Sequence, residues 1–103
     1  MNIEEISMQL LVNSGDAKSQ AMEAIENAKS GNISEARNQI DKAGKFLIAA
    51  HRFQTEIIQE EAAGNIKSVT VLLAHAQDHL MNAITAIDMA KEFIDLYEKI
   101  YAK

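Results

Sequence analysis

The sequence contains no cysteine and no proline, and its 103 residues include only four glycines. Without cysteine, the chain has no disulfide, no thiolate nucleophile and no cysteine-type zinc site. Without proline, and with so little glycine, the composition favours long helices and excludes collagen-like, proline-rich and disulfide-bonded scaffolds. Aromatic residues make up only 5% of the chain, but hydrophobic residues reach 48%, a normal share for a globular protein. We therefore predict a single helical domain spanning residues 1–103.

Basic residues are also few: ten Lys and Arg stand against 15 Asp and Glu, which gives a net charge of −5. Nucleic-acid binding depends on clustered Lys and Arg that displace counterions, so the scattered cations argue against DNA and RNA as partners. The longest fully apolar run, residues 46–50, is far too short to span a membrane. Residues 1–11 are acidic and interrupted by polar side chains, unlike a signal peptide. We expect a cytoplasmic protein without direct membrane insertion.

Two short segments, residues 30–33 and 63–66, have the composition of connections between helices. In each, a glycine can adopt the left-handed conformation that ends a helix, and the following asparagine can cap the next helix. Glu35 follows Asn32 at the spacing of a capping box. Gly15 marks a point where the first helix can kink or restart. These signals predict three helices, at about 3–30, 33–62 and 66–101.

Apolar residues recur at alternating steps of three and four through the second and third predicted helices, a spacing typical of helices packed at the shallow coiled-coil angle. In the second helix only Gln54 interrupts this seam. The pattern predicts an all-α fold, an antiparallel up-down-up three-helix bundle with long helices. The seam of the third helix consists of Ile66, Val69, Leu73, Ala76, Leu80, Ala83, Ile87, Ala90, Ile94, Tyr97 and Tyr101.

A second apolar row, here called the outer stripe, runs beside that seam: Val71, Leu72, Ala86, Met89, Phe93, Leu96 and Ile100. A helix in a monomeric three-helix bundle needs only one buried face. The outer stripe therefore predicts that the third helix packs against another copy of the chain. The alternative is a single wide core stripe.

Four polar residues interrupt the outer stripe: His75, Asp78, His79 and Asn82. His75 and His79 are four residues apart and His75 and Asp78 three apart, so these side chains are neighbours on the helix. Such a set can bind a metal ion, or one histidine can act as a nucleophile. The alternative is structural, with both histidines neutral and hydrogen-bonded and Asp78 orienting one of them.

The spacing His-x-x-Asp-His is similar to the zinc-protease pattern His-x-x-Glu-His, but a zinc hydrolase needs a further ligand and a substrate cleft. The one other histidine is His51, on the second predicted helix, and a three-helix bundle offers little cleft. A zinc hydrolase is therefore the weaker interpretation.

Residues 72–81, Leu-Leu-Ala-His-Ala-Gln-Asp-His-Leu-Met, resemble the signature of the lactose/cellobiose-class enzyme IIA of the bacterial phosphoenolpyruvate-dependent sugar phosphotransferase system. The similarity covers nearly the whole chain. It departs from the family pattern at Lys18, which is usually arginine, and at Asn82, which is often threonine. The other matching positions are Ser14 to Ser19, Ala50-His51, Gln54-Thr55, Ile58-Gln59 and Gly64.

The resemblance implies a phosphotransferase component that carries a phosphoryl group during uptake of a β-linked disaccharide of the lactose, cellobiose or chitobiose type. His75 would be the catalytic residue, accepting the group from phospho-HPr through Nε2 and passing it to a cysteine of the sugar-specific enzyme IIB. His79 would either donate a hydrogen bond to the phosphoryl group or pack near the seam. Gln77 lies about 160° around the helix from His75, so it would contact the group only from a neighbouring subunit, or else be a solvated surface residue.

The resemblance also implies a homotrimer in which Asp78 from each subunit lies near the three-fold axis around a divalent metal ion such as Mg²⁺. Three converging carboxylates would repel one another without a cation or bound protons. The alternative function is a metal-binding or structural helical bundle that oligomerises without phosphotransfer. Only a carrier is expected to hold an acid-labile phosphoryl group on His75.

Overall fold

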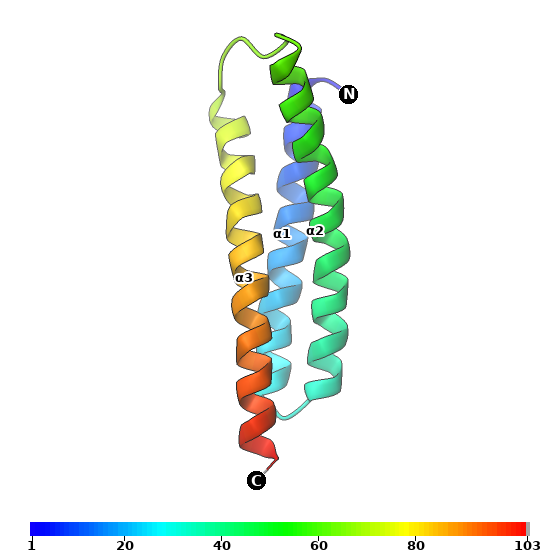
Figure 1. The fold of residues 1–103 in the computed structure, drawn as a ribbon, viewed down its shortest axis with the longest axis vertical. Helices are drawn as coiled ribbons and strands as arrows, with labels where there is room; N and C mark the ends of the chain where they lie inside the picture. Colours follow the sequence, from blue (N-terminus) through cyan, green and yellow to red (C-terminus); the bar gives the residue numbers. More distant parts are fainter. Residues whose placement is uncertain (103) are drawn as a thin grey trace.

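The computed structural model describes residues 1–102, which form three long helices (Figure 1): α1 (Ile3–Lys29), α2 (Ile33–Ala62) and α3 (Val71–Tyr101). α1 and α3 run in the same direction, and α2 runs antiparallel to both. The molecule is a rod with principal extents of 57 × 17 × 17 Å. Within the described residues no strand is present. The predicted all-α, up-down-up bundle is confirmed.

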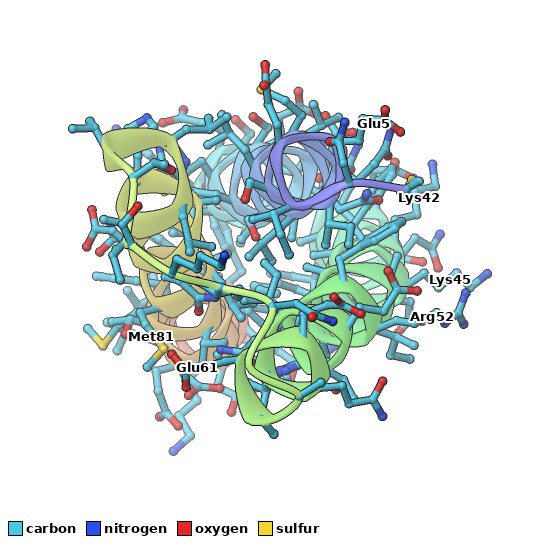
Figure 2. All side chains as sticks on the ribbon, turned by 90° about the horizontal axis from the view of Figure 1, so that it is seen from above. Glu5, Lys42, Lys45, Arg52, Glu61 and Met81 are labelled. Carbon is cyan, nitrogen blue, oxygen red and sulfur yellow. The ribbon has the colours of Figure 1, made fainter. Side chains whose placement is uncertain are left out.

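The core divides into two clusters along the rod, and both lie between the three helices (Figure 2). The lower cluster, toward the α1–α2 connection, is made largely of alanine: eight of its 11 buried residues, with Ile40, Ile87 and Ile94 as the others. The upper cluster lies level with the start of α3 and is built from larger side chains. Every seam residue of α3 from Leu73 to Ile94 is buried, as predicted. The upper cluster contains Ile6, Leu10, Ala50, Ile57, Leu73, Ala76 and Leu80.

α3 begins at Val71, five residues later than predicted, because Thr70 and not Asn65 caps it. The side chain of Thr70 accepts a hydrogen bond from the backbone N–H of Leu73 at 3.1 Å. Asn65 instead closes the end of α2, where its side-chain amide donates to Glu60 Oε2 at 2.9 Å. Ile66 lies outside the helix but still packs against the upper cluster, so the apolar spacing continues through a segment that is not helical.

Two smaller predictions about helix ends and breaks are also corrected. Asn32 occupies the N-cap position of α2, but its side chain makes no capping hydrogen bond and donates to Asn27 Oδ1 at 3.4 Å. α1 continues through Gly15 without a kink or restart. The glycines at the two connections do adopt the left-handed backbone, with φ of 87° at Gly31 and 79° at Gly64.

The lower end of the rod is closed by contacts between α3 and the other two helices. The hydroxyl of Tyr101 donates to the backbone carbonyl of Lys29, the last residue of α1. Arg37 of α2 forms exposed ion pairs with Asp95 at 3.2 Å and Glu98 at 3.0 Å. The hydrogen bond to Asp95 is the main reason that the pKa of Arg37 is raised above its ordinary value. These contacts fix the register of α3 at the end farthest from the histidines.

Candidate functional site

His75 and His79 lie on adjacent turns near the start of α3 and face each other, as predicted from their spacing. Their ring centroids are 4.4 Å apart, with the planes at 75° in an edge-to-face arrangement. His75 is exposed, whereas His79 is half-buried. The pair therefore offers one accessible imidazole in edge-to-face contact with a second, half-buried ring.

The cap at Thr70 places His75 in the second turn of α3. Side chains of a helix lean toward its N-terminus, so the His75 ring lies over the first turn. The first N–H groups of a helix have no partner within the helix and carry partial positive charge. His75 is thus in a position where a negative group on its ring is favoured by the local field.

Asp78 is exposed and pairs with Asn82, whose side-chain amide donates to Asp78 Oδ2 at 3.3 Å. Among the hydrogen bonds of residues 1–102, Asp78 has none to either histidine. Asp78 therefore does not orient either histidine, contrary to the structural alternative. Its second carboxylate oxygen remains available as an acceptor.

Gln77 lies on the other side of α3, against α2, as its helical angle predicts. Gln54 donates its side-chain Nε2–H to Gln77 Oε1 at 3.0 Å. His51 is exposed on α2, and its backbone carbonyl accepts from the Thr55 hydroxyl. The structure therefore brings His75 and His79 together and separates Gln77 and His51 from them within one chain.

Sequence reasoning missed two residues that shape the site. Thr70 is difficult to identify from sequence, because the preceding Gly64-Asn65 pair also has the composition of a helix boundary. The bond between Gln54 and Gln77 was also missed, although Gln54 was visible as the one polar interruption of the α2 seam.

The outer stripe is not part of the core of a single chain. Five of its seven side chains are exposed, from 38% at Phe93 to 88% at Val71, whereas Leu72 is half-buried and Ala86 packs against the lower cluster. Exposed apolar residues also occur on α1: Met8, Val12 and Met22. Met89, Phe93, Leu96 and Ile100 follow one another at steps of three and four, so they form an exposed apolar row on one side of α3, and such a row indicates an interaction site. The wide-core alternative is thus wrong.

The donor groups of one chain do not make a metal site alone. Within the described residues no three His, Asp or Glu side chains lie close enough together to hold an ion. Asp78 is a hard oxygen ligand with a free lone pair on an exposed surface. Its donor set fits a cation only if other copies of the chain supply further carboxylates.

No helix in residues 1–102 has the length and apolar character needed to cross a membrane.

Comparison with known protein families gives one match that covers most of the chain. Residues 5–98 match the model of the lactose/cellobiose-specific IIA subunit of the phosphotransferase system. The lichenan-specific phosphotransferase enzyme IIA component of Bacillus subtilis (strain 168) is 52% identical over 98 residues, which cover 95% of this chain and 89% of that protein. The N,N'-diacetylchitobiose-specific EIIA component of Escherichia coli (strain K12) is 39% identical over 100 residues, covering 97% and 86%.

Solved structures show the same similarity. The cellobiose-specific enzyme IIA from Bacillus anthracis superposes with a TM-score of 0.94 at 53% identity, covering 100% of this chain and 94% of that one. The IIA subunit in a complex of IIA(Chitobiose) with HPr from Escherichia coli superposes with a TM-score of 0.84 at 37% identity, covering 98% of each chain.

Proposed function

Because the chain belongs to the lactose/cellobiose-specific IIA subunits of the phosphotransferase system, which carry phosphoryl groups in sugar uptake, we propose that His75 is the residue that carries the group. The observation that supports this assignment most directly is the exposed imidazole of His75, held edge-to-face by His79 at 4.4 Å. The sugars served by the family are of the lactose, cellobiose and chitobiose type.

His75 has the chemistry that a reversible carrier needs. A neutral imidazole is nucleophilic near pH 7, and its phosphoramidate bond remains labile. In the first step the lone pair of His75 Nε2 attacks the phosphorus of phospho-HPr, so that an N–P bond forms on His75 as the N–P bond of the donor breaks. In the second step a cysteine thiolate of enzyme IIB attacks the same phosphorus, so that an S–P bond forms and the His75 ring leaves as neutral imidazole.

Phosphoryl transfer depends mainly on placement and on electrostatic stabilisation of the moving group. The N-terminal turn of α3 contributes a favourable field for the anion on His75. His79 is one turn farther along α3 and close enough to position the ring, and its own N–H can donate to the phosphoryl oxygens. Both features are compatible with a carrier that needs no bound cofactor for the transfer itself.

The outer stripe would be buried in a homotrimer. Burying exposed apolar side chains such as Met89, Phe93 and Leu96 supplies the driving force for assembly. In such an assembly His75 lies at a groove between subunits, which keeps it accessible to HPr and to enzyme IIB. Gln77, which faces away from its own His75, would then serve the phosphoryl group of an adjacent copy.

Asp78 from each copy would hold a divalent cation, such as Mg²⁺, near the three-fold axis. The ion would neutralise carboxylates that otherwise repel one another. Sedimentation of wild type with and without chelator, beside Asp78→Leu, tests this role without any activity assay. A trimer that dissociates in chelator identifies a structural metal bridge. If the wild-type trimer persists in chelator, and the Asp78→Leu trimer is equally or more stable than wild type, the metal is incidental.

We place the carrier in the cytoplasm, where it would exchange phosphoryl groups with HPr and enzyme IIB. The test of the whole assignment is intact mass after incubation with phosphoenolpyruvate, enzyme I and HPr. We expect one acid-labile phosphoryl adduct on wild type and on His51→Ala, the matched control at an exposed histidine of α2. We expect none on His75→Ala.

The alternative function, a structural or metal-binding bundle, predicts a different result in the same experiment. It predicts no adduct on the wild-type protein even when the chain is folded and assembled. An adduct that persists on His75→Ala would assign the carrier role to another residue.

A further inference from the structure

Gln54 is a polar residue at a position of the α2 seam that otherwise carries apolar side chains. It is half-buried, level with the upper core cluster, where Ala50 and Ile57 occupy the neighbouring seam positions of α2. Burying part of an amide is unfavourable unless its hydrogen bonds are made. Gln54 meets this requirement through a single side-chain hydrogen bond, which it donates to Gln77 of α3 at 3.0 Å.

The direction of this hydrogen bond decides which part of the Gln77 amide is left free. A glutamine side chain has one carbonyl oxygen that accepts and one NH₂ group with two donors. Gln54 donates, so the carbonyl oxygen of Gln77 is turned toward α2. The NH₂ group of Gln77 therefore remains available, and it has no side-chain or backbone acceptor among the hydrogen bonds of residues 1–102.

Gln77 lines a surface cleft between α2 and α3. This cleft has a volume of about 250 Å³, and it also borders Ile58, Glu61 and Ala74. Gln77 is about 160° around α3 from His75 of the same chain, so it can reach only a group supplied from outside the chain. An amide that offers two donors and no acceptor to the outside is suited to an anion.

We propose that Gln54 is a positioning residue for phosphoryl transfer. It fixes the rotation of the Gln77 amide, so that Gln77 presents N–H donors and not its carbonyl oxygen to the phosphoryl group on His75 of an adjacent copy. This inference rests on the proposed carrier function and on the proposed assembly. It adds a residue of α2 to a site whose other members all lie on α3.

Two substitutions separate control of amide direction from simple tethering. Gln54→Glu has almost the same shape, but its carboxylate can only accept, so Gln77 must turn over to donate to it and then points its carbonyl oxygen outward. Gln54→Met keeps the length of the side chain and removes the hydrogen bond, which leaves the Gln77 amide free to rotate. We expect the rate of transfer from the phosphorylated protein to enzyme IIB to fall by about tenfold in Gln54→Glu and by roughly threefold in Gln54→Met. If Gln54 only anchored the Gln77 side chain and did not set its direction, Gln54→Met would transfer more slowly than Gln54→Glu, because only Gln54→Glu keeps a hydrogen bond to Gln77.

Two controls separate the direction of the Gln77 amide from the added negative charge of Gln54→Glu. Gln59→Glu adds the same negative charge to α2 at an exposed position that does not line this cleft, and we expect it to transfer faster than Gln54→Glu. In a Gln77→Ala background, Gln54→Glu should produce no further loss, since the residue through which it acts is gone. Thermal unfolding and oligomer mass, measured for every variant, show whether fold and assembly are kept.

The outcomes distinguish failure of this inference from failure of the carrier assignment. If His75→Ala still accepts a phosphoryl group, the carrier assignment fails whatever the Gln54 variants do. If His75 carries the group but Gln54→Glu transfers at the wild-type rate, or slows transfer further in the Gln77→Ala background, Gln54 does not act through the Gln77 amide. If Gln54→Glu does not fold, the transfer rates of Gln54→Met, Gln77→Ala and the Gln54→Met/Gln77→Ala double variant provide the test instead. The losses must then overlap in the double variant, and losses that add in full overturn the inference.

Discussion

Replacing Thr70 by alanine tests where α3 begins, and with it the position of His75 in the helix. The Thr70 side chain is the hydrogen-bond acceptor for the Leu73 N–H, at 3.1 Å. In the Thr70→Ala variant that N–H loses its partner at a partly buried helix end. Loss of such a cap costs about 1 kcal/mol, within a range of roughly 0.5–2 kcal/mol. For a domain of this size, 1 kcal/mol lowers the midpoint of thermal unfolding by about 4–8 °C.

The matched control is Asn65→Ala, because Asn65 is the cap that the Gly-Asn sequence suggests. The Asn65 side chain contributes an exposed hydrogen bond to Glu60 Oε2, while its backbone N–H bond to the Glu60 carbonyl is kept in the variant, so we expect Asn65→Ala to cost less than about 0.5 kcal/mol. Thr70→Ser keeps the hydroxyl, so its midpoint of thermal unfolding should be close to that of wild type. The assay is thermal unfolding followed by circular dichroism at one fixed protein concentration, since assembly makes the midpoint depend on concentration.

The reverse order of the two alanine variants would refute this account of the helix start. If Asn65→Ala were the more destabilising change, and the amides of residues 67–70 were protected from hydrogen exchange, α3 would begin near residue 66. The His75 ring would then lie two turns inside the helix, beyond the field of its N-terminus.

Three further predictions concern stability. Leu80→Ala, at a fully buried position of the upper cluster, should cost about 2–5 kcal/mol in urea unfolding, whereas Met81→Ala, whose side chain extends outward (Figure 2), should cost less than about 1 kcal/mol. Arg37→Ala should lower the unfolding midpoint by only a few degrees, about 4 °C at most and less in high salt, because its ion pairs are exposed. Since the pKa of Arg37 is raised above its ordinary value, the contribution of its charge is complete at neutral pH and is lost only in strongly alkaline solution. A midpoint difference between wild type and Arg37→Ala that changes across neutral pH would contradict this. Tyr101→Phe should cost about 1 kcal/mol and speed hydrogen exchange in the last turn of α1, because it removes the hydrogen bond to the Lys29 carbonyl; unchanged exchange there would show that this bond is not maintained in solution.

The fold could be predicted because it depends on a pattern repeated along whole helices. Leu73, Leu80, Ile87 and Ile94 follow one another at intervals of two turns, and all are buried. Assigning one of these positions wrongly would leave the predicted three-helix bundle unchanged. The start of α3 depends on one hydroxyl group. Ile66 continues the apolar spacing although it is outside the helix, because a loop that crosses the end of the core also buries an apolar side chain. The apolar spacing alone therefore could not locate the start of α3.

The candidate site was predictable where it depends on helix geometry alone. The spacing of four residues places His75 beside His79, and the angle of Gln77 turns it away from both. The partner of Asp78 could not be predicted, because Asn82 and the two histidines are all within reach of it on the same helix face. The bond between Gln54 and Gln77 joins two helices and depends on their relative register, which the sequence does not specify for one polar pair.

The alanine-lined lower cluster bears on whether a negative charge at the His75 end of the bundle can alter the surface at its other end. Alanine has no side-chain rotamers, so a core of this kind has almost no alternative packing arrangements. A negative charge gained at one end of a 57 Å rod therefore cannot be passed to the other end by rearranging side chains. If His75 carries the phosphoryl group, as proposed, we expect protein partners that distinguish the loaded from the empty carrier to contact the end of the bundle around His75 and not its far end.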